Sequence, residues 1–311
     1  MTMPRPRAAC KAAFLLSSLV LTTARAEWQR TETTIGWTTG TNLLWQFSFD
    51  PLKGKPFFHP LTANRVSLTN FKPEDHPWHY GLWFSWKYIN HVNYWEEDRA
   101  TGKAEGATRW TPPKLKTRAD GSATITFNVT YTNPSNHVDM TETRDLKISA
   151  PETDGSFTID WTAKFKAGSA GAILDRTPMP NEPDGKVNGG YAGLGLRMAS
   201  APLTVSFVCP TGAVTHFETD RARPNAAAVA CNFADGGNAL GGIAIFSDPK
   251  NAGANAPWYL INSDKMRFAC AAILAPKIRV LKPGERMALH YRIAVRPRMW
   301  TPEELKSGHD H

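Results

Sequence analysis

Residues 157–165 read Phe157-Thr-Ile-Asp-Trp-Thr-Ala-Lys-Phe165, with an apolar residue at every second position and mostly polar residues between. Because side chains of a β-strand point alternately to its two faces, this pattern predicts a strand with one buried and one solvated face. The same period of two recurs in residues 122–131 and 287–295 and, more briefly, in residues 203–207. Half-buried strands of this kind are typical of antiparallel sheets.

Turn signals separate these strands, in Asp120-Gly121, Asn133-Pro134, Asp154-Gly155 and Pro283-Gly284. The best helical signal is at the C-terminal end, where Thr301 is placed to cap a helix, Pro302 takes its first position and Glu304 its third. No Pro- or Ser-rich linker and no internal repeat divides the sequence. We therefore predict an all-β protein, a large antiparallel β-sandwich of two packed sheets that forms a single domain over residues 27–311.

The first 26 residues predict a cleaved signal peptide rather than part of the fold. A positively charged start precedes an apolar segment over residues 12–21, which is too short to span a bilayer. Ala24-Arg-Ala26 has the small-residue spacing of a cleavage site. We expect export by the general secretory (Sec) route to the periplasm or the extracellular space. No membrane span is expected in the mature chain, because no later segment approaches about 18 uninterrupted apolar residues.

The net charge of +8 does not indicate a nucleic-acid partner, because part of it belongs to the signal segment and the other cations are scattered. Cys10 would leave with the signal peptide. Cys209 and Cys231 could pair in an oxidising compartment, and three buried free thiols, with Cys270 as the third, are an equal alternative. No Cys-x-x-Cys pair suggests zinc, we assign no cofactor, and the oligomeric state is left open.

Residues with chemical potential gather between Asn70 and Glu97, which reads Asn-Phe-Lys-Pro-Glu-Asp-His-Pro-Trp-His-Tyr-Gly-Leu-Trp-Phe-Ser-Trp and, shortly afterwards, Asn-Tyr-Trp-Glu-Glu. His76 and His79 lie three residues apart beside Asp75, and two nearby prolines exclude a helix there. Two imidazoles can act as acid and base, hydrogen-bond substrate hydroxyls or bind a metal ion. A catalytic metal normally needs a third protein ligand, which the spacing does not identify, so we assign none.

Aromatic residues surround the histidines. A strand over residues 80–86 would place one set of side chains on one face and a second set on the other: Tyr80, Leu82, Phe84 and Trp86 against Gly81, Trp83 and Ser85. One of these sets is expected to be core. Trp78 and Trp95 lie outside that strand and flank polar residues such as Glu96, so they are better candidates to stack on a sugar ring.

A second segment, Gly189-Gly-Tyr-Ala-Gly-Leu-Gly-Leu-Arg197, has glycines spaced somewhat like those of a phosphate-binding loop. The residues that follow predict a strand rather than a helix, which argues against a dinucleotide site. Glycines within a strand mark a bulge or a close approach of backbone or ligand. Arg197 could orient a substrate oxygen or form a surface salt bridge, and Tyr191 is a further substrate-binding candidate. The preceding loop, residues 175–190, is long enough to be functional or mobile.

These two segments, together with Tyr94-Trp-Glu96 and a closing Leu281-Lys-Pro-Gly-Glu-Arg286, resemble the secreted bacterial family described as PmoA-like or "methane oxygenase PmoA", a domain of unknown function. The resemblance covers about residues 43–295. The motif usual in that family, Asp-His-Pro-His-His-Arg, has Trp78 and Tyr80 in this chain in place of a histidine and the arginine. His76 and His79 remain as the matched pair, and Arg197 matches in the second motif.

A methane-oxidising role fits poorly with a chain that lacks a spanning segment after its signal. The strand pattern instead resembles the galactose-mutarotase supersandwich, a fold shared by sugar epimerases, polysaccharide lyases and glycoside hydrolases. Fold resemblance alone does not fix a reaction.

Three hypotheses follow. The first is a secreted carbohydrate-active protein that uses His-assisted acid–base chemistry, as an epimerase, lyase or hydrolase. In it the catalytic residues are His76, His79 and Arg197, and the substrate-binding residues are Asp75, Trp78, Tyr80, Trp95, Glu96 and Tyr191. The second is a non-catalytic glycan-binding module. The third is a metal or redox protein, as the methane label would suggest.

Overall fold

A computed structural model describes residues 1, 3, 26–251, 253 and 257–308. The predicted signal peptide lies almost entirely outside the described residues, so the boundary placed at residue 27 stays a prediction. Within the described ranges, no helix is long and apolar enough to cross a membrane.

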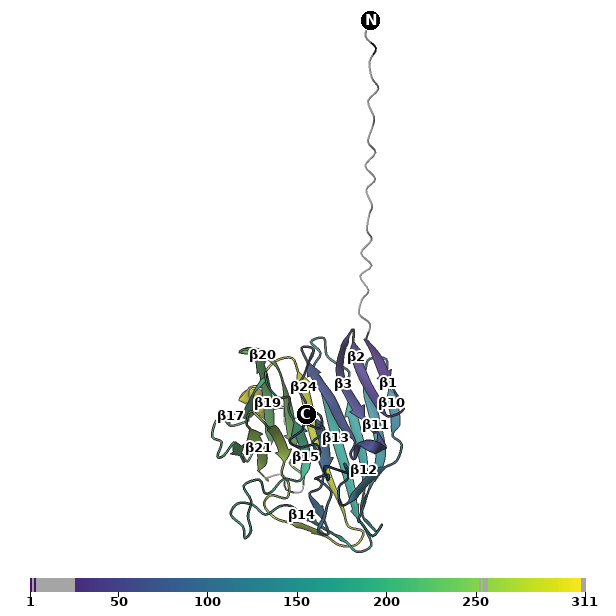
Figure 1. The fold of residues 1–311 in the computed structure, drawn as a ribbon, viewed down its shortest axis with the longest axis vertical. Coiled ribbons are helices and arrows are strands. Elements are labelled where there is room, and N and C mark those ends of the chain that lie inside the picture. Colours follow the sequence, from purple (N-terminus) through teal and green to yellow (C-terminus); the bar gives the residue numbers. More distant parts are fainter. Residues whose placement is uncertain (2, 4–25, 252, 254–256, 309–311) are drawn as a thin grey trace.

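Two ten-stranded antiparallel sheets form the body of the protein (Figure 1). The first sheet runs β1 (Ala26–Arg30), β2 (Thr34–Thr39), β3 (Asn42–Ser48), β4 (Phe57–Ala63), β6 (Leu82–Ser85), β15 (Gly193–Arg197), β22 (Arg267–Ala271), β21 (Trp258–Asn262) and β18 (Arg221–Ala222), with β5 (Val66–Ser67) beside β4. The second runs β10 (Lys114–Thr117), β11 (Ala123–Thr132), β12 (Val138–Ile148), β13 (Phe157–Ala167), β24 (Arg286–Arg296), β20 (Asn238–Ser247), β19 (Ala228–Asp235), β16 (Thr204–Cys209) and β17 (Gly212–Val214), with β9 (Ala107–Trp110) beside β11.

A small third sheet joins β23 (Arg279–Leu281), β14 (Ala172–Asp175), β7 (Tyr88–Ile89) and β8 (Val92–Asn93). Helical structure among the described residues is limited to η1 (Pro51–Lys53) and α1 (Pro302–Ser307). Thr301 and Glu304 form the capping box expected for α1. The predicted strands appear as β11, β13, β24 and β16, so the prediction of an antiparallel, all-β sandwich is confirmed.

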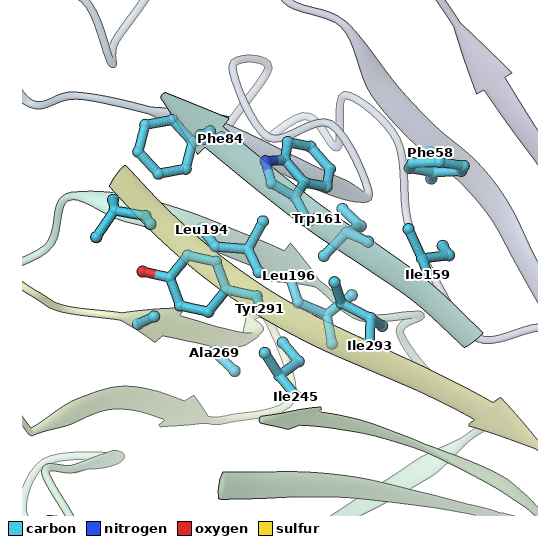
Figure 2. Close-up of a cluster of buried hydrophobic side chains, with 14 of the residues drawn as sticks. Phe58, Phe84, Ile159, Trp161, Leu194, Leu196, Ile245, Ala269, Tyr291 and Ile293 are labelled. Carbon is cyan, nitrogen blue, oxygen red and sulfur yellow. The ribbon is translucent and has the colours of Figure 1, made fainter. Parts of the chain in front are cut away.

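The main core lies between the two large sheets. Figure 2 shows Ile159 and Trp161 of β13, and Tyr291 and Ile293 of β24, gathered around Leu194 and Leu196 of β15, in the first sheet. Trp161, Leu194, Leu196 and Ile293 are completely buried. Full burial of a large apolar side chain contributes about 1.5–3 kcal/mol, so this alternate-residue packing is the main force that joins the sheets.

The first sheet is also buried on its other face. In β15 the leucines face the main core, whereas Gly195 and Arg197 point the opposite way, where Trp83, Tyr259 and Phe268 form a second apolar cluster. The side chain of Trp83 lies so close to Gly195 that a Cβ there would come within 3.2 Å of the ring. We call this side of the first sheet its outer face, and the candidate site lies on it.

The strand predicted over residues 80–86 is shorter than expected, and its alternation is interrupted. β6 spans only Leu82–Ser85, and Tyr80 packs in the outer cluster with Trp83 rather than with Leu82 in the main core. The cause is Gly81, whose φ of 73° turns the backbone before the strand begins. A Cβ at Gly81 would lie 2.4 Å from a backbone carbonyl oxygen, which further favours glycine at this position. Both faces of β6 are buried, so neither set of side chains is solvated.

Cys209, Cys231 and Cys270 are all free and buried. Of the two alternatives for the cysteines, the structure therefore has three thiols and no Cys209–Cys231 disulfide. Burial raises the pKa of all three thiols, to about 11 for Cys209 and to about 12 for Cys270. They are poor candidates for nucleophiles.

Candidate functional site

A cavity of about 250 Å³ lies on the outer face of the first sheet. Strands β18, β21 and β22 form its floor, and segments around residues 76–79, 95–96 and 187–191 form its walls. Its lining consists of His76, Trp78, His79, Trp95, Glu96, Val187, Asn188, Tyr191, Arg221, Tyr259, Ile261, Met266 and Phe268. Most of the predicted site residues meet here, although they come from two segments about a hundred residues apart.

Another cavity, of about 260 Å³, is associated with β13, β20 and β24. Two of its ionisable side chains, Asp160 and Arg292, form an ion pair of 2.7 Å, and His290 bonds to Thr162. The cavity that contains His76 and His79 is therefore the stronger candidate for chemistry.

The histidine segment is held as a series of turns. The backbone N–H of His79 donates to the carbonyl of His76 at 3.0 Å, and that of Lys72 donates to the carbonyl of His79 at 2.8 Å. The guanidinium of Arg99 donates to the carbonyls of Glu74 and Asp75 at 2.8 and 2.7 Å. The exclusion of a helix at this position was correct. The backbone contacts fix the direction in which both imidazoles point.

His79 is a neutral hydrogen-bond donor. Only 2% of it is exposed, and its ring stacks on those of His76 and Phe268, with centroids 4.7 and 5.0 Å away. Burial is the main cause that holds the pKa of His79 well below its ordinary value of 6.5. Its Nδ1 lies 3.4 Å from Nη1 of Arg197. Because a guanidinium only donates, Nδ1 must accept, and the single proton of the ring is on Nε2.

His76 has the opposite polarity. Its Nδ1 lies 2.9 Å from Oδ2 of Asp75. Burial raises the pKa of Asp75, but hydrogen bonds from His76 and Arg197 outweigh it, so the pKa is lowered overall and the carboxylate is ionised. An ionised carboxylate only accepts, so Nδ1 of His76 donates, and in the neutral form of the ring the lone pair is on Nε2. About a third of the His76 side chain is exposed, so this ring is accessible from the cavity.

Arg197 holds both histidines in these states. It is completely buried at the end of β15, and its Nη2 donates to both carboxylate oxygens of Asp75 at 2.8 Å and to the carbonyl of Lys265 at 3.1 Å. Neither Arg197 nor Asp75 lines the cavity. Arg197, which we predicted to be catalytic, and Asp75, which we predicted to bind substrate, therefore lie in position to orient the two imidazoles.

Glu96 and Tyr191 form a second polar group in the cavity. Glu96 accepts hydrogen bonds from Lys87, from Asn93 at 2.8 Å and from the hydroxyl of Tyr191. Burial raises the pKa of Glu96, but the charge and hydrogen bond of Lys87 and the bonds from Tyr191 and Asn93 outweigh it and lower the pKa. Glu96 is therefore an ionised acceptor. Both residues were predicted from the sequence as substrate-binding candidates, and both line the cavity.

The two tryptophans predicted to stack on a sugar differ in their surroundings. Trp78 is partly exposed, and the guanidinium of Arg99 lies 5.4 Å from its ring centroid. Trp95 is only 1% exposed and is packed edge-on against Tyr191, with centroids 5.2 Å apart. Trp95 therefore forms part of a wall, whereas Trp78 offers a more open ring.

Tyr80 does not line the cavity. It is completely buried, and its hydroxyl donates to the two oxygens of Glu97 at 2.6 and 2.7 Å. Glu97 also pairs with Lys55 at 2.7 Å, and Lys55 in turn donates to the carbonyl of Trp95. This buried network supports the wall from behind. Tyr80 and Lys55 are both buried and both bind the carboxylate of Glu97, so neither can contact a substrate in the cavity. Tyr80 is therefore not retained as a substrate contact.

Sequence reasoning did not find the floor residues Arg221, Tyr259 and Phe268. Arg221 lies on a strand of only two residues, whereas Tyr259 and Phe268 lie on short, mostly apolar strands. Only the register brings them together: Arg221 faces Ile261, and Ile261 faces Phe268. The only available signal was that residues 258–261 and 268–274 are apolar runs, which indicate burial without a site.

The loop over residues 175–190 contributes wall residues but no acid. Asp175 and Glu182 pair with Arg176 rather than with a histidine. Arg223 donates to the carbonyls of Val187 and Gly189 at 3.1 and 2.7 Å, which ties the loop to the floor. Across the part of the chain that the structure describes, no group of three or more His, Cys, Asp and Glu side chains could hold a metal ion.

Several solved structures are similar to this chain, and two of them are described here. One is described as a "putative aldose 1-epimerase" from Klebsiella pneumoniae subsp. pneumoniae MGH 78578, with 8% identity, a TM-score of 0.45, and coverage of 89% of this chain and 82% of that one. The other is the galactosidase domain of the alpha-galactosidase-sucrose kinase AgaSK, with 9% identity, a TM-score of 0.41, and coverage of 88% of this chain and 41% of that one.

No curated protein matches the sequence. A family description does match, over residues 35–309, which is most of the chain and includes every residue of the cavity. The chain therefore belongs to the family of unknown function DUF6807.

Proposed function

We propose that this protein is a secreted carbohydrate-active enzyme that binds one sugar ring in the cavity and moves a proton on it with His76 and His79. The observation that carries the proposal is the opposite polarity of the two imidazoles, one with a free lone pair and one with a free N–H. Base and donor side by side are what a proton-transfer reaction on a polyol needs.

In this proposal His76 is the base. Asp75 holds its Nδ1–H at 2.9 Å, so Nε2 is the atom that takes a proton from the sugar, and the ionised carboxylate stabilises the imidazolium that forms. In an epimerase that opens the ring, this proton comes from the C1 hydroxyl as the C1–O5 bond breaks, and Nε2 returns it to that oxygen when the ring oxygen closes onto the other face of C1. In a lyase the proton comes from a carbon and passes to the oxygen that departs. His79 stays neutral and donates its Nε2–H to the sugar oxygen on which negative charge develops.

This arrangement supports an epimerase or a lyase better than a hydrolase. Hydrolysis of a glycoside generally uses two carboxyl groups, one of which must carry a proton. The cavity lining contains one carboxyl group, that of Glu96, and its lowered pKa keeps it ionised. Glu96 is suited to accept hydrogen bonds from sugar hydroxyls rather than to protonate a leaving group.

The ligand class follows from the walls. Trp78 offers a partly exposed ring for the C–H face of a pyranose, the buried rings of Tyr259 and Phe268 make the floor apolar, and Glu96 and Asn188 offer polar groups for the hydroxyls. A volume of about 250 Å³ suits a single ring rather than an oligosaccharide.

Export belongs to the proposal and rests on residues 1–26, and sequencing the N-terminus of protein recovered from the periplasm or medium would test it. The likeness to the PmoA-like family rests on the sequence motifs alone.

The test is turnover by wild-type protein and by His76→Asn, followed by NMR on a panel of aldoses, hexuronates and short glycosides. We expect new anomeric or epimeric signals with the wild type and a loss of about 10²–10⁴-fold in rate with His76→Asn, the range usual for removal of a general base. His91→Asn is the matched control, because His91 is an exposed histidine outside the cavity, with a φ of 68° that asparagine tolerates.

Calorimetric binding of the same sugars separates the alternatives. Binding of a sugar without any product in long incubations would favour a glycan-binding module over an enzyme. Full turnover by His76→Asn would refute the role of His76.

A further inference from the structure

Arg221 lies at the end of the cavity away from the histidines. In the register of the first sheet it faces Ile261, which faces Phe268, the residue on which His79 stacks. Residues paired in this way share one face of a sheet, so Arg221 and Phe268 both face the cavity, about 10 Å apart at their Cα atoms. Such a separation is comparable with one sugar ring and its exocyclic substituent.

The guanidinium of Arg221 is fixed but carries an uncompensated charge. Its Nε donates to the hydroxyl of Tyr259 at 3.1 Å, and its Nη1 donates to the carbonyl of Thr219 at 2.6 Å. Among the described residues it forms no ion pair with a carboxylate. Both of its hydrogen bonds go to neutral oxygens, and they hold the side chain at the cavity without neutralising it.

A second cation adds to the positive charge at this end. The guanidinium of Arg223 lies 4.4 Å from the ring centroid of Tyr259 and, like Arg221, has no carboxylate partner among the residues described. Its buried Nη1 has no hydrogen-bond partner within the part of the chain that the structure describes. Tyr259 therefore lies between two unneutralised arginines.

The nearby acids do not cancel this charge. Glu96 lines the same cavity, but its charge is balanced by Lys87. Glu218 is exposed and meets Arg221 only through backbone hydrogen bonds, at 2.8 and 2.9 Å. One end of the cavity is therefore positively charged, and the end with the histidines is close to neutral.

We propose that the sugar bound in this cavity carries an anionic substituent, a carboxylate or a sulfate ester, and that Arg221 binds that substituent while the ring lies against His76 and His79. The inference rests on the proposed function, since it names the substrate class of the same site. A guanidinium presents paired N–H donors that match the geometry of both anions. A neutral sugar would leave this charge without a partner in a partly desolvated site.

The experiment is calorimetric binding of D-galacturonate, D-glucuronate and galactose 6-sulfate, each against its neutral parent, galactose or glucose, to wild-type protein and to Arg221→Gln. We expect the wild type to bind at least one acidic sugar about tenfold or more tightly than the parent, and we expect Arg221→Gln to lose that preference. Binding of the neutral parent is expected to change little. The sulfate and carboxylate arms show which anion the site takes.

Arg109→Gln is the matched control, because it removes the charge of an exposed arginine on β9, outside the cavity. It should leave the preference intact. Equal affinity of the wild type for acidic and neutral sugars, or a preference that survives in Arg221→Gln, would overturn the inference. If neutral sugars bind and are converted without any acidic preference, this inference alone fails. If no sugar of either kind binds, the proposed function fails with it.

Discussion

Asp75→Asn tests the arrangement that assigns opposite roles to the two histidines. The carboxylate of Asp75 accepts from His76 at 2.9 Å and from Nη2 of Arg197 at 2.8 Å on each oxygen. An amide of the same shape replaces one oxygen with a donor, which opposes Nη2 of Arg197 at either position and also opposes His76 at the position of Oδ2. In either orientation the negative charge that stabilises the imidazolium of His76 is lost. Where the amide nitrogen faces His76, that ring must also move its proton to Nε2, and the free lone pair in the cavity disappears.

The expected loss of activity is therefore about 10²–10⁴-fold, the usual contribution of a positioned general base. Stability should fall as well, because Arg197 is completely buried and keeps its charge. Breaking a fully buried ion pair costs about 3–5 kcal/mol. Because a third of the Asp75 side chain is exposed, solvent screens part of this, and we expect about 2 kcal/mol. At roughly 2–4 °C per kcal/mol for a large domain, Tm should drop by about 4–8 °C.

The assays are turnover by NMR on a sugar that the wild type converts, and urea denaturation at pH 7. Asp160→Asn is the control, because Asp160 also pairs with an arginine, Arg292, but both side chains are more than a third exposed. That change should cost under about 1 kcal/mol and leave turnover intact. Turnover by Asp75→Asn within about threefold of the wild type would refute the assignment of His76 as the base.

Three further predictions concern the framework. Burial lowers the pKa of His59 to about 4, so below the ordinary histidine pKa of 6.5 the unfolded chain binds more protons than the folded chain, and stability should fall as pH drops from about 6.5 towards 4. Urea denaturation at pH 7 and pH 5 should show a smaller loss of stability for His59→Gln than for the wild type. An equal loss in both proteins would contradict the argument. Gly81→Ala, at a φ of 73° and with a carbonyl oxygen 2.4 Å from the new Cβ, should lower the free energy of unfolding in urea by about 2 kcal/mol or more. Gly102→Ala, at a φ of 67° but in open space, should lower it by about 1 kcal/mol. Equal costs for the two variants would show that the close contact at Gly81 is relieved. Hydrogen bonds, chiefly from Arg296, lower the pKa of Glu304 to about 2. The stability that the Glu304 carboxylate contributes is therefore fully present above its ordinary pKa of 4.5 and is lost as pH falls through 2. Glu304→Gln should lower Tm at pH 7 but not at pH 2, and a difference in Tm that does not vary with pH would contradict this.

Where one face of a strand is solvated, the sequence alone was sufficient. Residues 157–165 alternate because β13 belongs to the second sheet, whose outer face meets water, and the period of two shows through. The C-terminal helix was also predictable, since Thr301 and Glu304 satisfy its first turn locally. Both signals depend on neighbours in the sequence rather than on neighbours in space.

The strands of the first sheet near the cavity follow a different rule. All five residues of β22 are buried, since loops cover the outer face, so apolar residues occupy both parities and the period disappears. Phe268 could not be assigned to a site without its register against Arg197. The local prediction for Tyr80 failed because a single positive φ at Gly81 exchanged the two faces. The histidine run was visible because charged residues between aromatic ones have no use in a core.

The alternation within β15 has a consequence for how this protein could change over time or under design. Leu194 and Leu196 belong to the main core, whereas the intervening Gly195 and the following Arg197 belong to the cavity side. Alternate residues of one short strand thus serve two separate roles, packing between the sheets and support of the cavity. Substitutions at its odd positions can alter the chemistry while the packing that joins the sheets is preserved. A new substrate specificity could therefore arise in this protein while the core between the two sheets stays the same.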